Sequence, residues 1–202
     1  GRIVLMTSIG VTNRTGAYNR ATEAHDWKRR SERLVRASGL PYTIVRPGWF
    51  DYNGPDEHRL VLLQGDRRQA GDPSDGAVAR RQIAEVLVRS LVSDQALRKT
   101  FELIATASPA PKDLDALFAP LDPDPLGALD GVRDMANMPL GDEPQRVRDD
   151  LEAMLADRPT NGESLQRGRS VLGYKSSQGG SYDKCNCRHR SWSDRSGYRA
   201  TG

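Results

Sequence analysis

The sequence predicts an α/β fold built on a partial doubly wound parallel sheet. Residues 2–8 form a continuous apolar run that ends in hydroxyl residues, which is typical of a strand covered by helices on both faces. A helical pattern follows over residues 22–38, and a second run, rich in β-branched residues, occupies residues 41–47. A strand, a helix and a strand in this order form a right-handed βαβ crossover, so we expect two parallel strands in one sheet.

The helix over residues 22–38 is predicted to be amphipathic. The loop before it, residues 10–16, contains turn formers, and Gly39 supplies a left-handed stop after it. The side chains expected on the inward face recur every three or four residues and are Ala24, Trp27, Ser31, Leu34, Val35 and Ser38. The cations expected on the remaining, solvated positions are Lys28, Arg29, Arg33 and Arg36. Trp27 is therefore expected to pack in the core or at a domain interface.

The later elements are predicted to complete the sheet and its cover. Strands are expected over residues 58–63 and 101–105, and helices over residues 77–92 and 112–121. A last surface helix is expected over residues 145–155. The inward side chains of the helix over residues 77–92 are expected to be Ile83, Val86, Leu87 and Leu91.

Composition divides the chain into an α/β domain over residues 1–121, an irregular or helical extension over 122–157 and a basic tail over 158–202. Residues 1–157 contain 21 Lys and Arg against 24 Asp and Glu, a net charge of −3. The tail contains 9 against 3, a net charge of +6, so the pI of about 9.0 belongs to the tail. Nucleic-acid binding by the domain is therefore not expected. Few aliphatic residues occur in the tail, which predicts disorder or a frameshifted end.

Location and metal binding are constrained only by what the sequence lacks. No run of about 18 or more apolar residues occurs, so no membrane span is predicted. The first residues carry no secretory pattern, so a cytoplasmic protein is expected. Cys185, Cys187 and His189 could be zinc ligands, but they lack a fourth ligand and the usual spacing. No metal site is therefore predicted.

Four sequence blocks form a recognisable set. They are Ile3-Val-Leu-Met-Thr-Ser-Ile-Gly10, Lys28 with Glu32 four residues later, Ser38-Gly-Leu-Pro-Tyr-Thr-Ile-Val-Arg-Pro-Gly48, and residues 78–87. Together they resemble the C-terminal portion of the atypical short-chain dehydrogenase/reductase family, in its NAD(P)H-binding, NmrA-like and NAD-dependent epimerase/dehydratase-like branch. The resemblance covers residues 2–106, with weaker support to residue 155. It implies the C-terminal half of a Rossmann-like domain, with the cofactor over the carboxyl ends of the strands.

The resemblance also implies site residues. Ser8 would be the catalytic hydroxyl that polarises the substrate, and Lys28 the lysine that holds the nicotinamide ribose and lowers the pKa of a tyrosine. Arg46, Pro47 and Gly48 would line the cofactor site, with the backbone after Pro47 meeting the nicotinamide carboxamide. The cofactor implied is NAD or NADP, and the residue that selects between them is not part of this sequence.

Two departures from the family pattern affect catalysis and cofactor binding. Ala24 stands four residues before Lys28, where the family has its catalytic tyrosine. Tyr18 could replace that tyrosine only if its loop folded back, and His25 is the other candidate. The sequence also contains no Gly-x-x-Gly-x-x-Gly, the turn that cradles the cofactor diphosphate. Binding of a dinucleotide by this chain alone is therefore expected to be weak.

The predicted function is that of an NAD(P)-binding oxidoreductase or epimerase-like protein acting on an unidentified small molecule. Two alternatives stay open. Ala24 favours a catalytically silent NAD(P)-binding sensor or regulator, and the missing glycine-rich turn favours a non-functional truncated or mis-called fragment. A sheet with an unpaired edge strand would also allow a homodimer through that edge.

Overall fold

The computed structural model describes residues 1–157. The predicted disorder of residues 158–202, and the Cys185, Cys187 and His189 triplet, lie outside the described residues. Within them, no helix has both the length and the apolar character needed to cross a membrane.

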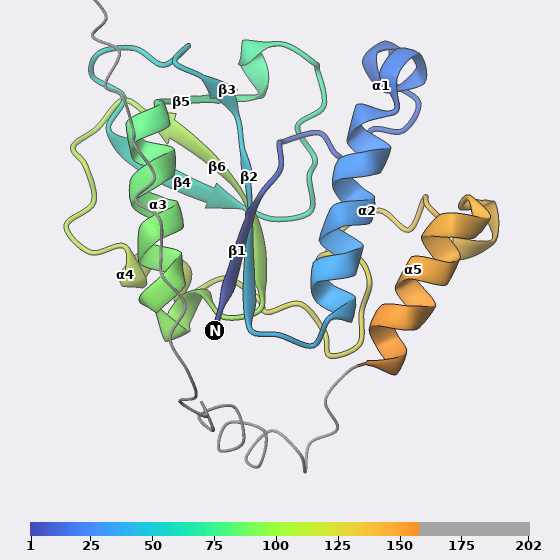
Figure 1. Ribbon diagram of the computed structural model, residues 1–202. Helices are drawn as coiled ribbons and strands as arrows, with labels where there is room; N and C mark the ends of the chain where they lie inside the picture. The colour runs from blue at the N-terminus through green and yellow to red at the C-terminus, as the bar shows by residue number, and fades with distance from the viewer. Residues whose placement is uncertain (158–202) are drawn as a thin grey trace, which may run out of the picture. The chain divides into compact units, whose positions relative to one another are not determined.

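The described residues form one mixed, mostly parallel sheet with helices on both faces (Figure 1). The strand order is β1 (Ile3–Met6), β2 (Tyr42–Pro47), β6 (Lys99–Thr106), β5 (Ala77–Val78) and β3 (Trp49–Phe50), and β4 (Arg59–Leu63) also pairs with β6. The pairs β1–β2, β2–β6 and β3–β5 are parallel, whereas β4 and β5 run antiparallel to β6. The predicted α/β, Rossmann-like class is therefore confirmed at this level.

β2 is an interior strand, and β1 lies at the edge. All six residues of β2 are buried because the strand has a parallel neighbour on each side. β1 pairs only with β2 among the described residues, and Met6 is 44 % exposed. The strand predicted over residues 2–8 is therefore found over Ile3–Met6, with α2 and α3 both in contact with it. It lies at the edge of the sheet and not in its interior, because its other long edge has no partner within residues 1–157.

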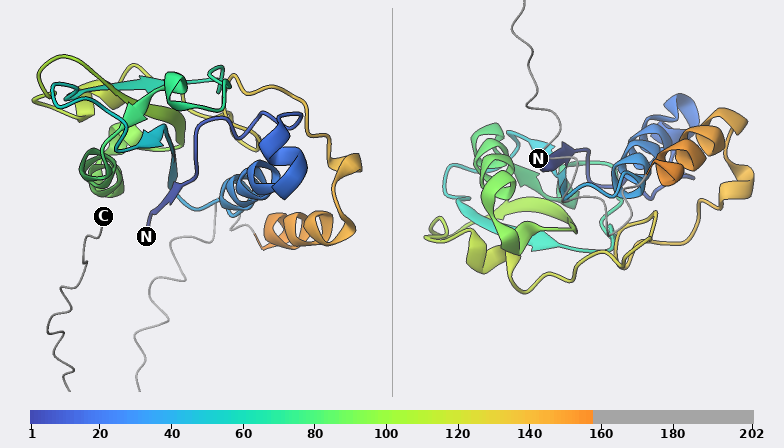
Figure 2. Two further views of the ribbon diagram at one scale, coloured as in Figure 1. Left: turned by 90° about the horizontal axis from the view of Figure 1, so that it is seen from above. Right: turned by 60° about the horizontal axis from the view of Figure 1, so that its bottom comes forward.

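One face of the sheet is covered by α3 (Arg80–Val92) and α4 (Asp115–Phe118), as Figures 1 and 2 show. Ile83 and Val86 point inward as predicted, but Leu91 is 47 % exposed, so its inward assignment was wrong. The short 3-10 helices are Pro73–Asp75, Asp94–Ala96 and Leu140–Asp142. The hydrophobic core that includes residues of the sheet, α3 and α4 consists of the buried residues Val45, Leu60, Val78, Ile83, Val86, Ala96, Phe101, Leu103, Ala105 and Phe118.

The other face is covered by α2 (Ala24–Ala37), against which α5 (Gln145–Ala156) packs (Figure 2). A short helix, α1 (Ala17–Thr22), precedes α2 and is separated from it by Glu23, which has a left-handed φ of 53°. The helix predicted over residues 22–38 is therefore α2, which begins after this break, whereas Tyr18, expected in a loop, lies in α1. Residues 122–157 pack in the same compact unit as residues 1–121.

The predicted inward face of α2 is wrong. Trp27 is 50 % exposed and carries the Arg30 guanidinium 4.5 Å above its ring. The buried residues are instead mostly charged: Asp26, Arg29, Arg30, Glu32, Arg33, Arg36 and Ala37. Their partners are carboxylates and carbonyl oxygens of the extension, such as Asp130 and Glu143. Because these partners satisfy the charges, the cationic face can be buried.

Candidate functional site

The loop after β1 is held in one conformation by Asp66. The Asp66 carboxylate accepts hydrogen bonds from the Gly10 amide (2.6 Å), the Thr12 amide (2.7 Å) and the Thr12 hydroxyl (2.8 Å). Asp66 is 1 % exposed, so these bonds are shielded from water. The Ile9 amide donates to the Pro47 carbonyl oxygen (3.0 Å) and continues the pairing beyond β1. Ser8 therefore lies on a rigid backbone at the carboxyl ends of two parallel strands.

Ser8 and Lys28 meet at this place. The Lys28 Nζ donates a hydrogen bond of 2.9 Å to the Ser8 Oγ, and both side chains are partly buried. Burial lowers the pKa of the Lys28 ammonium from its ordinary value, because desolvation disfavours the charged form. A hydroxyl and an ammonium side by side can polarise a carbonyl oxygen or bind the hydroxyls of a sugar. The structure thus brings together the two residues implied to be catalytic.

His25 lies next to this pair at the start of α2. Its backbone amide and that of Asp26 donate to the Asn19 side-chain oxygen, at 2.9 and 3.2 Å, which caps the helix. The His25 ring lies 5.2 Å from the Tyr18 ring, and its buried Nδ1 has no hydrogen-bond partner among the described residues. Burial and the charge of the neighbouring Lys28 lower the pKa of His25. A backbone hydrogen bond at Asn13 and the charges of Asp66 and Asp26 act in the opposite direction but are outweighed. The imidazole is therefore held in its neutral form.

Glu32 is the centre of a buried network beneath the pair. It accepts hydrogen bonds from the Thr7 hydroxyl (2.7 Å) and from two Arg46 nitrogens (3.0 and 2.6 Å), and Arg36 lies 3.3 Å away. Burial alone would raise the pKa of Glu32, but the charges and hydrogen bonds of Arg46, Arg36 and Thr7 outweigh it and hold the pKa at about 2. Lys28 and Glu32, one helical turn apart, thus contact the consecutive residues Ser8 and Thr7.

The other implied site residues have structural contacts. Arg46 is completely buried, and its guanidinium is bound by Glu32 and by Asp134, the latter at 2.8 and 2.7 Å. The Pro47 carbonyl oxygen accepts from Ile9. Gly48 is required by packing, since a Cβ there would lie 2.3 Å from the Gly76 carbonyl oxygen. The expectation that Arg46 lines a cofactor site is therefore corrected, because its donors are used inside the protein.

Sequence reasoning missed Asp66, Asn19 and Asp134, which position the site from a distance. Asp66 follows Gly65 directly after a strand, a place where an aspartate often binds loop amides, so a weak local signal existed. Asn19 lies within a helix and caps the next one, and Asp134 lies in the extension. Neither contact follows from sequence spacing.

Comparison with known families supports the cofactor class that this site suggests. Residues 1–94 match the family model described as NAD(P)H-binding. This segment is the N-terminal part of the chain and ends before β6, so the match is shorter than the resemblance to residue 106 noted above. Residues 1–94 are therefore similar to NAD(P)H-binding proteins.

Two curated relatives and one solved structure illustrate the similarity. An uncharacterised chloroplastic protein of Arabidopsis thaliana is 35 % identical over 123 residues, which are 58 % of this chain and 37 % of that protein. Sanguinarine reductase of Eschscholzia californica is 32 % identical over 96 residues, covering 46 % and 34 %. A short-chain dehydrogenase/reductase of Veillonella parvula, solved with NADP, is 18 % identical with a TM-score of 0.38, covering 55 % and 54 %. The chain spans about a third of the length of the curated relatives.

Proposed function

We propose that this chain supplies the nicotinamide end of the cofactor site, and the carbonyl-polarising hydroxyl, of an NAD(P)-dependent oxidoreductase or epimerase-like enzyme. The observation that carries the proposal is the 2.9 Å hydrogen bond from Lys28 Nζ to Ser8 Oγ. It joins the two implied residues at the carboxyl end of β1, where cofactors lie in doubly wound sheets.

The residues present fit one end of a dinucleotide. Lys28 would donate to the ribose hydroxyls, and Gly10, with a left-handed φ of 80°, keeps the adjacent loop narrow. For the diphosphate of the cofactor, this sequence contains no glycine-rich turn. We therefore propose that the diphosphate is bound by a segment outside this sequence, which corresponds to the N-terminal half of the domain. When bound, the nicotinamide supplies or accepts a hydride.

The protein's own residues would handle the proton and the polarised oxygen. The Ser8 hydroxyl would donate to the substrate carbonyl oxygen, while Lys28 donates to Ser8 and stabilises developing negative charge. Ala24 cannot donate a proton. His25 is the proposed proton-transfer group, because it is held neutral and its Nδ1 lacks a partner within residues 1–157.

A second candidate function is a silent NAD(P)-binding sensor, which Ala24 favours. It predicts cofactor binding without turnover. The small-molecule substrate and the choice between NAD and NADP are not set by the residues described. The cytoplasmic location also stays a prediction, and the Arabidopsis relative above is named chloroplastic.

The test uses the protein expressed from its natural gene, assayed for NADH and NADPH binding and for turnover with a panel of carbonyl compounds. Ser8→Ala is expected to lower kcat/KM by roughly 100-fold, as removal of one oxyanion donor does, and to leave cofactor affinity unchanged. Lys28→Met is expected to lower both kcat/KM and the affinity for the cofactor. The matched control is Lys112→Met, since Lys112 is exposed and far along the chain.

Three outcomes decide between the candidates. Turnover that survives both Ser8→Ala and Lys28→Met contradicts the assignment of this pair. Tight binding with no turnover across the panel, weakened by Lys28→Met, supports the sensor instead. No binding of either nicotinamide cofactor contradicts both and supports the fragment hypothesis.

A further inference from the structure

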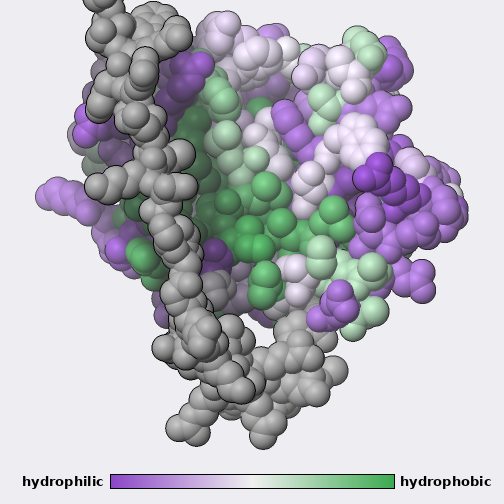
Figure 3. All heavy atoms as spheres, viewed as in Figure 1, coloured by the Kyte–Doolittle hydropathy of each residue, from purple (hydrophilic) through white to green (hydrophobic). Residues whose placement is uncertain are grey.

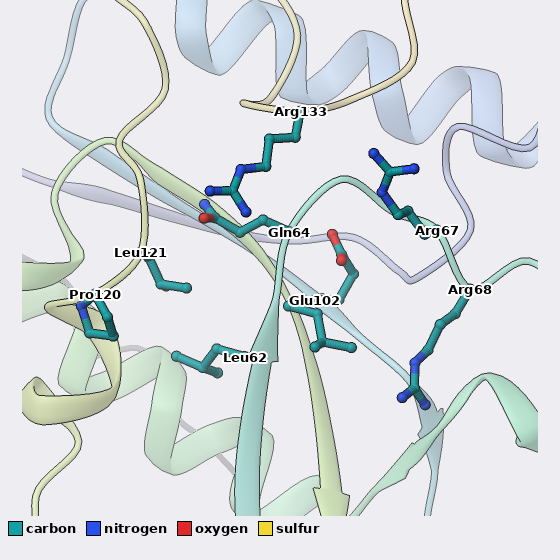
Figure 4. A pocket seen from close by; sticks show the side chains of 9 residues that line it. Leu62, Gln64, Arg67, Arg68, Glu102, Pro120, Leu121 and Arg133 are labelled. Atoms are coloured by element: carbon teal, nitrogen blue, oxygen red, sulfur yellow. The ribbon is translucent and has the colours of Figure 1, made fainter.

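A cavity of about 480 Å³ is lined by neither Ser8 nor Lys28 (Figure 4). Its lining residue Glu102 stands opposite Arg46 in the pairing of β6 with β2. The cavity opens between the end of β4, the middle of β6 and the extension. Its volume is within the range of small-molecule sites. The lining residues are Leu62, Leu63, Gln64, Arg67, Arg68, Glu102, Pro120, Leu121 and Arg133.

The inner wall of this cavity contains a buried carboxyl group, one oxygen of which has no hydrogen-bond partner among the described residues. Glu102 is 3 % exposed, and its Oε1 accepts no hydrogen bond from any described residue. The nearest cation, Arg46 Nη1, is 3.7 Å away and already binds Asp134. Figure 4 shows the Glu102 carboxyl group pointing into the cavity. A buried polar group in this state costs free energy, so its retention calls for a ligand.

Glu102 is held in its protonated form at neutral pH. Burial raises its pKa to about 8; Arg46 and a hydrogen bond from the Asp66 backbone amide oppose this, while the carboxylates of Asp66 and Asp134 add to it. A protonated carboxyl group is a hydrogen-bond donor. The charged side chains that face Glu102 are Arg46 from β2, Asp66 from the loop after β4, and Asp134 from the extension, together with the arginines of the cavity.

Two arginines flank this donor at the mouth. Arg67 and Arg133 lie on either side of the Glu102 carboxyl group in Figure 4, whereas Arg68 points away and donates to the Asp75 carbonyl oxygen. Arg67 makes no ion pair within the described residues, and Arg133 pairs only with the exposed Asp122. Leu62, Leu121 and Pro120 form an apolar side of the cavity.

We propose that this cavity binds an amphipathic carboxylate, a small molecule with an apolar body and a single carboxylate group. The carboxylate accepts from Arg67 and Arg133, whose planar guanidinium groups match it, and from the Glu102 hydroxyl. The apolar body covers Leu62 and Leu121. A cationic ligand is disfavoured because the arginines would repel it. The site does not include Ser8 or Lys28 and does not rest on the proposed oxidoreductase function.

The test measures binding of octanoate, octanol and octylamine to the full chain by calorimetry at pH 7, without any nicotinamide cofactor. Octanoate is expected to bind at least tenfold more tightly than octanol, and octylamine not at all. Arg67→Gln is expected to weaken octanoate binding about tenfold, the effect of one charged hydrogen bond. Arg67 is exposed, so this variant should fold. Arg81→Gln is the control, since Arg81 is an exposed arginine that pairs with Glu85 on α3.

A pH series identifies the part played by Glu102. Above its pKa Glu102 becomes an anion and repels the ligand, so octanoate affinity is expected to fall about tenfold between pH 7 and pH 9. In Glu102→Gln, which keeps a donor but cannot ionise, the affinity should stay constant over the same range. A parallel fall in wild type and variant would assign the effect to other groups.

Several results would overturn the proposal. They are equal binding of octanol and octanoate, binding of octylamine as tight as that of octanoate, absence of octanoate binding, or equal loss in the Arg67→Gln and Arg81→Gln variants. Because no cofactor is present, any of them would leave the assignment of Ser8 and Lys28 unaffected.

Discussion

At the scale of single residues, one helical turn of α2 connects the candidate site to the protein's interior. The spacing of Lys28 and Glu32 is visible in the sequence, and it places both side chains on the face that meets the end of β1. Lys28 reaches Ser8, and Glu32 reaches Thr7. The same turn therefore carries a candidate catalytic residue and the carboxylate that fixes the backbone beside it.

Glu32→Gln is predicted to destabilise the protein by about 3 kcal/mol or more at pH 7, since it leaves two buried arginines without their shared carboxylate. The folded pKa of about 2 lies below the unfolded value of 4.5, so the unfolded state binds more protons between them. The stability due to Glu32 is therefore complete above pH 4.5 and is lost as the pH falls toward 2. Urea unfolding at several pH values measures both effects.

The matched control for Glu32 is Glu85→Gln, because Glu85 is exposed and pairs only with Arg81 along α3. Its expected effect is within about 0.5 kcal/mol at every pH. Equal stability losses in the two variants would contradict the central role given to Glu32.

The site could be predicted only where residue roles follow from local spacing. The Ser8–Lys28 pair is one turn of helix set against one strand end, and the structure joins these two side chains by a hydrogen bond. Arg46 follows the same pattern, yet its environment is decided by Asp134, 88 residues later. A charge at a strand end looks the same in sequence whether it faces a ligand or a buried carboxylate.

At the scale of elements, α2 shows where periodicity fails. The prediction that the apolar residues of α2 face inward assumes that the surface packed against this helix is apolar. The extension instead presents Asp130, Glu143 and carbonyl oxygens, and Arg33 binds both carboxylates and the Met138 carbonyl oxygen. A helix face is buried when its partner surface complements it, and that partner lies about a hundred residues away in the chain.

Arg33→Met is predicted to detach the extension before the rest of the protein unfolds. Removing this cation leaves Glu143, 1 % exposed in its side chain, short of one of its two partners, at a cost of about 3 kcal/mol. Limited proteolysis should therefore cut residues 122–143 faster, at urea concentrations where α3 still resists exchange of its amide protons.

Arg20→Met on α1 is the control for this measurement, because Arg20 is exposed and also belongs to a helix. It should leave the cleavage rate of the extension unchanged. Uniform cleavage over all regions of Arg33→Met would show instead that the extension and the sheet unfold together.

At the scale of the whole molecule, the described residues form a Rossmann-like sheet in which β1 is an open edge strand. The class and the parallel pairing of β1 with β2 follow from the βαβ pattern, because the handedness of the crossover leaves few arrangements. The antiparallel pairing of β4 and β5 with β6 does not follow from that pattern, because short strands carry little directional signal. Figure 3 shows apolar residues gathered over β1, between α2 and α3.

This open edge leads to a prediction about self-association. The β1 backbone has no partner on one side, and α3 beside it exposes Val88 (66 %) and Val92 (69 %). An edge of this kind pairs with another strand, so we propose that the isolated chain forms a dimer whose population rises with concentration in sedimentation velocity. Val88→Glu with Val92→Glu should shift it to monomer, whereas Leu126→Glu, at a residue 80 % exposed outside α3 and β1, should not. A monomer at all concentrations would mean that the edge is closed by other parts of the chain.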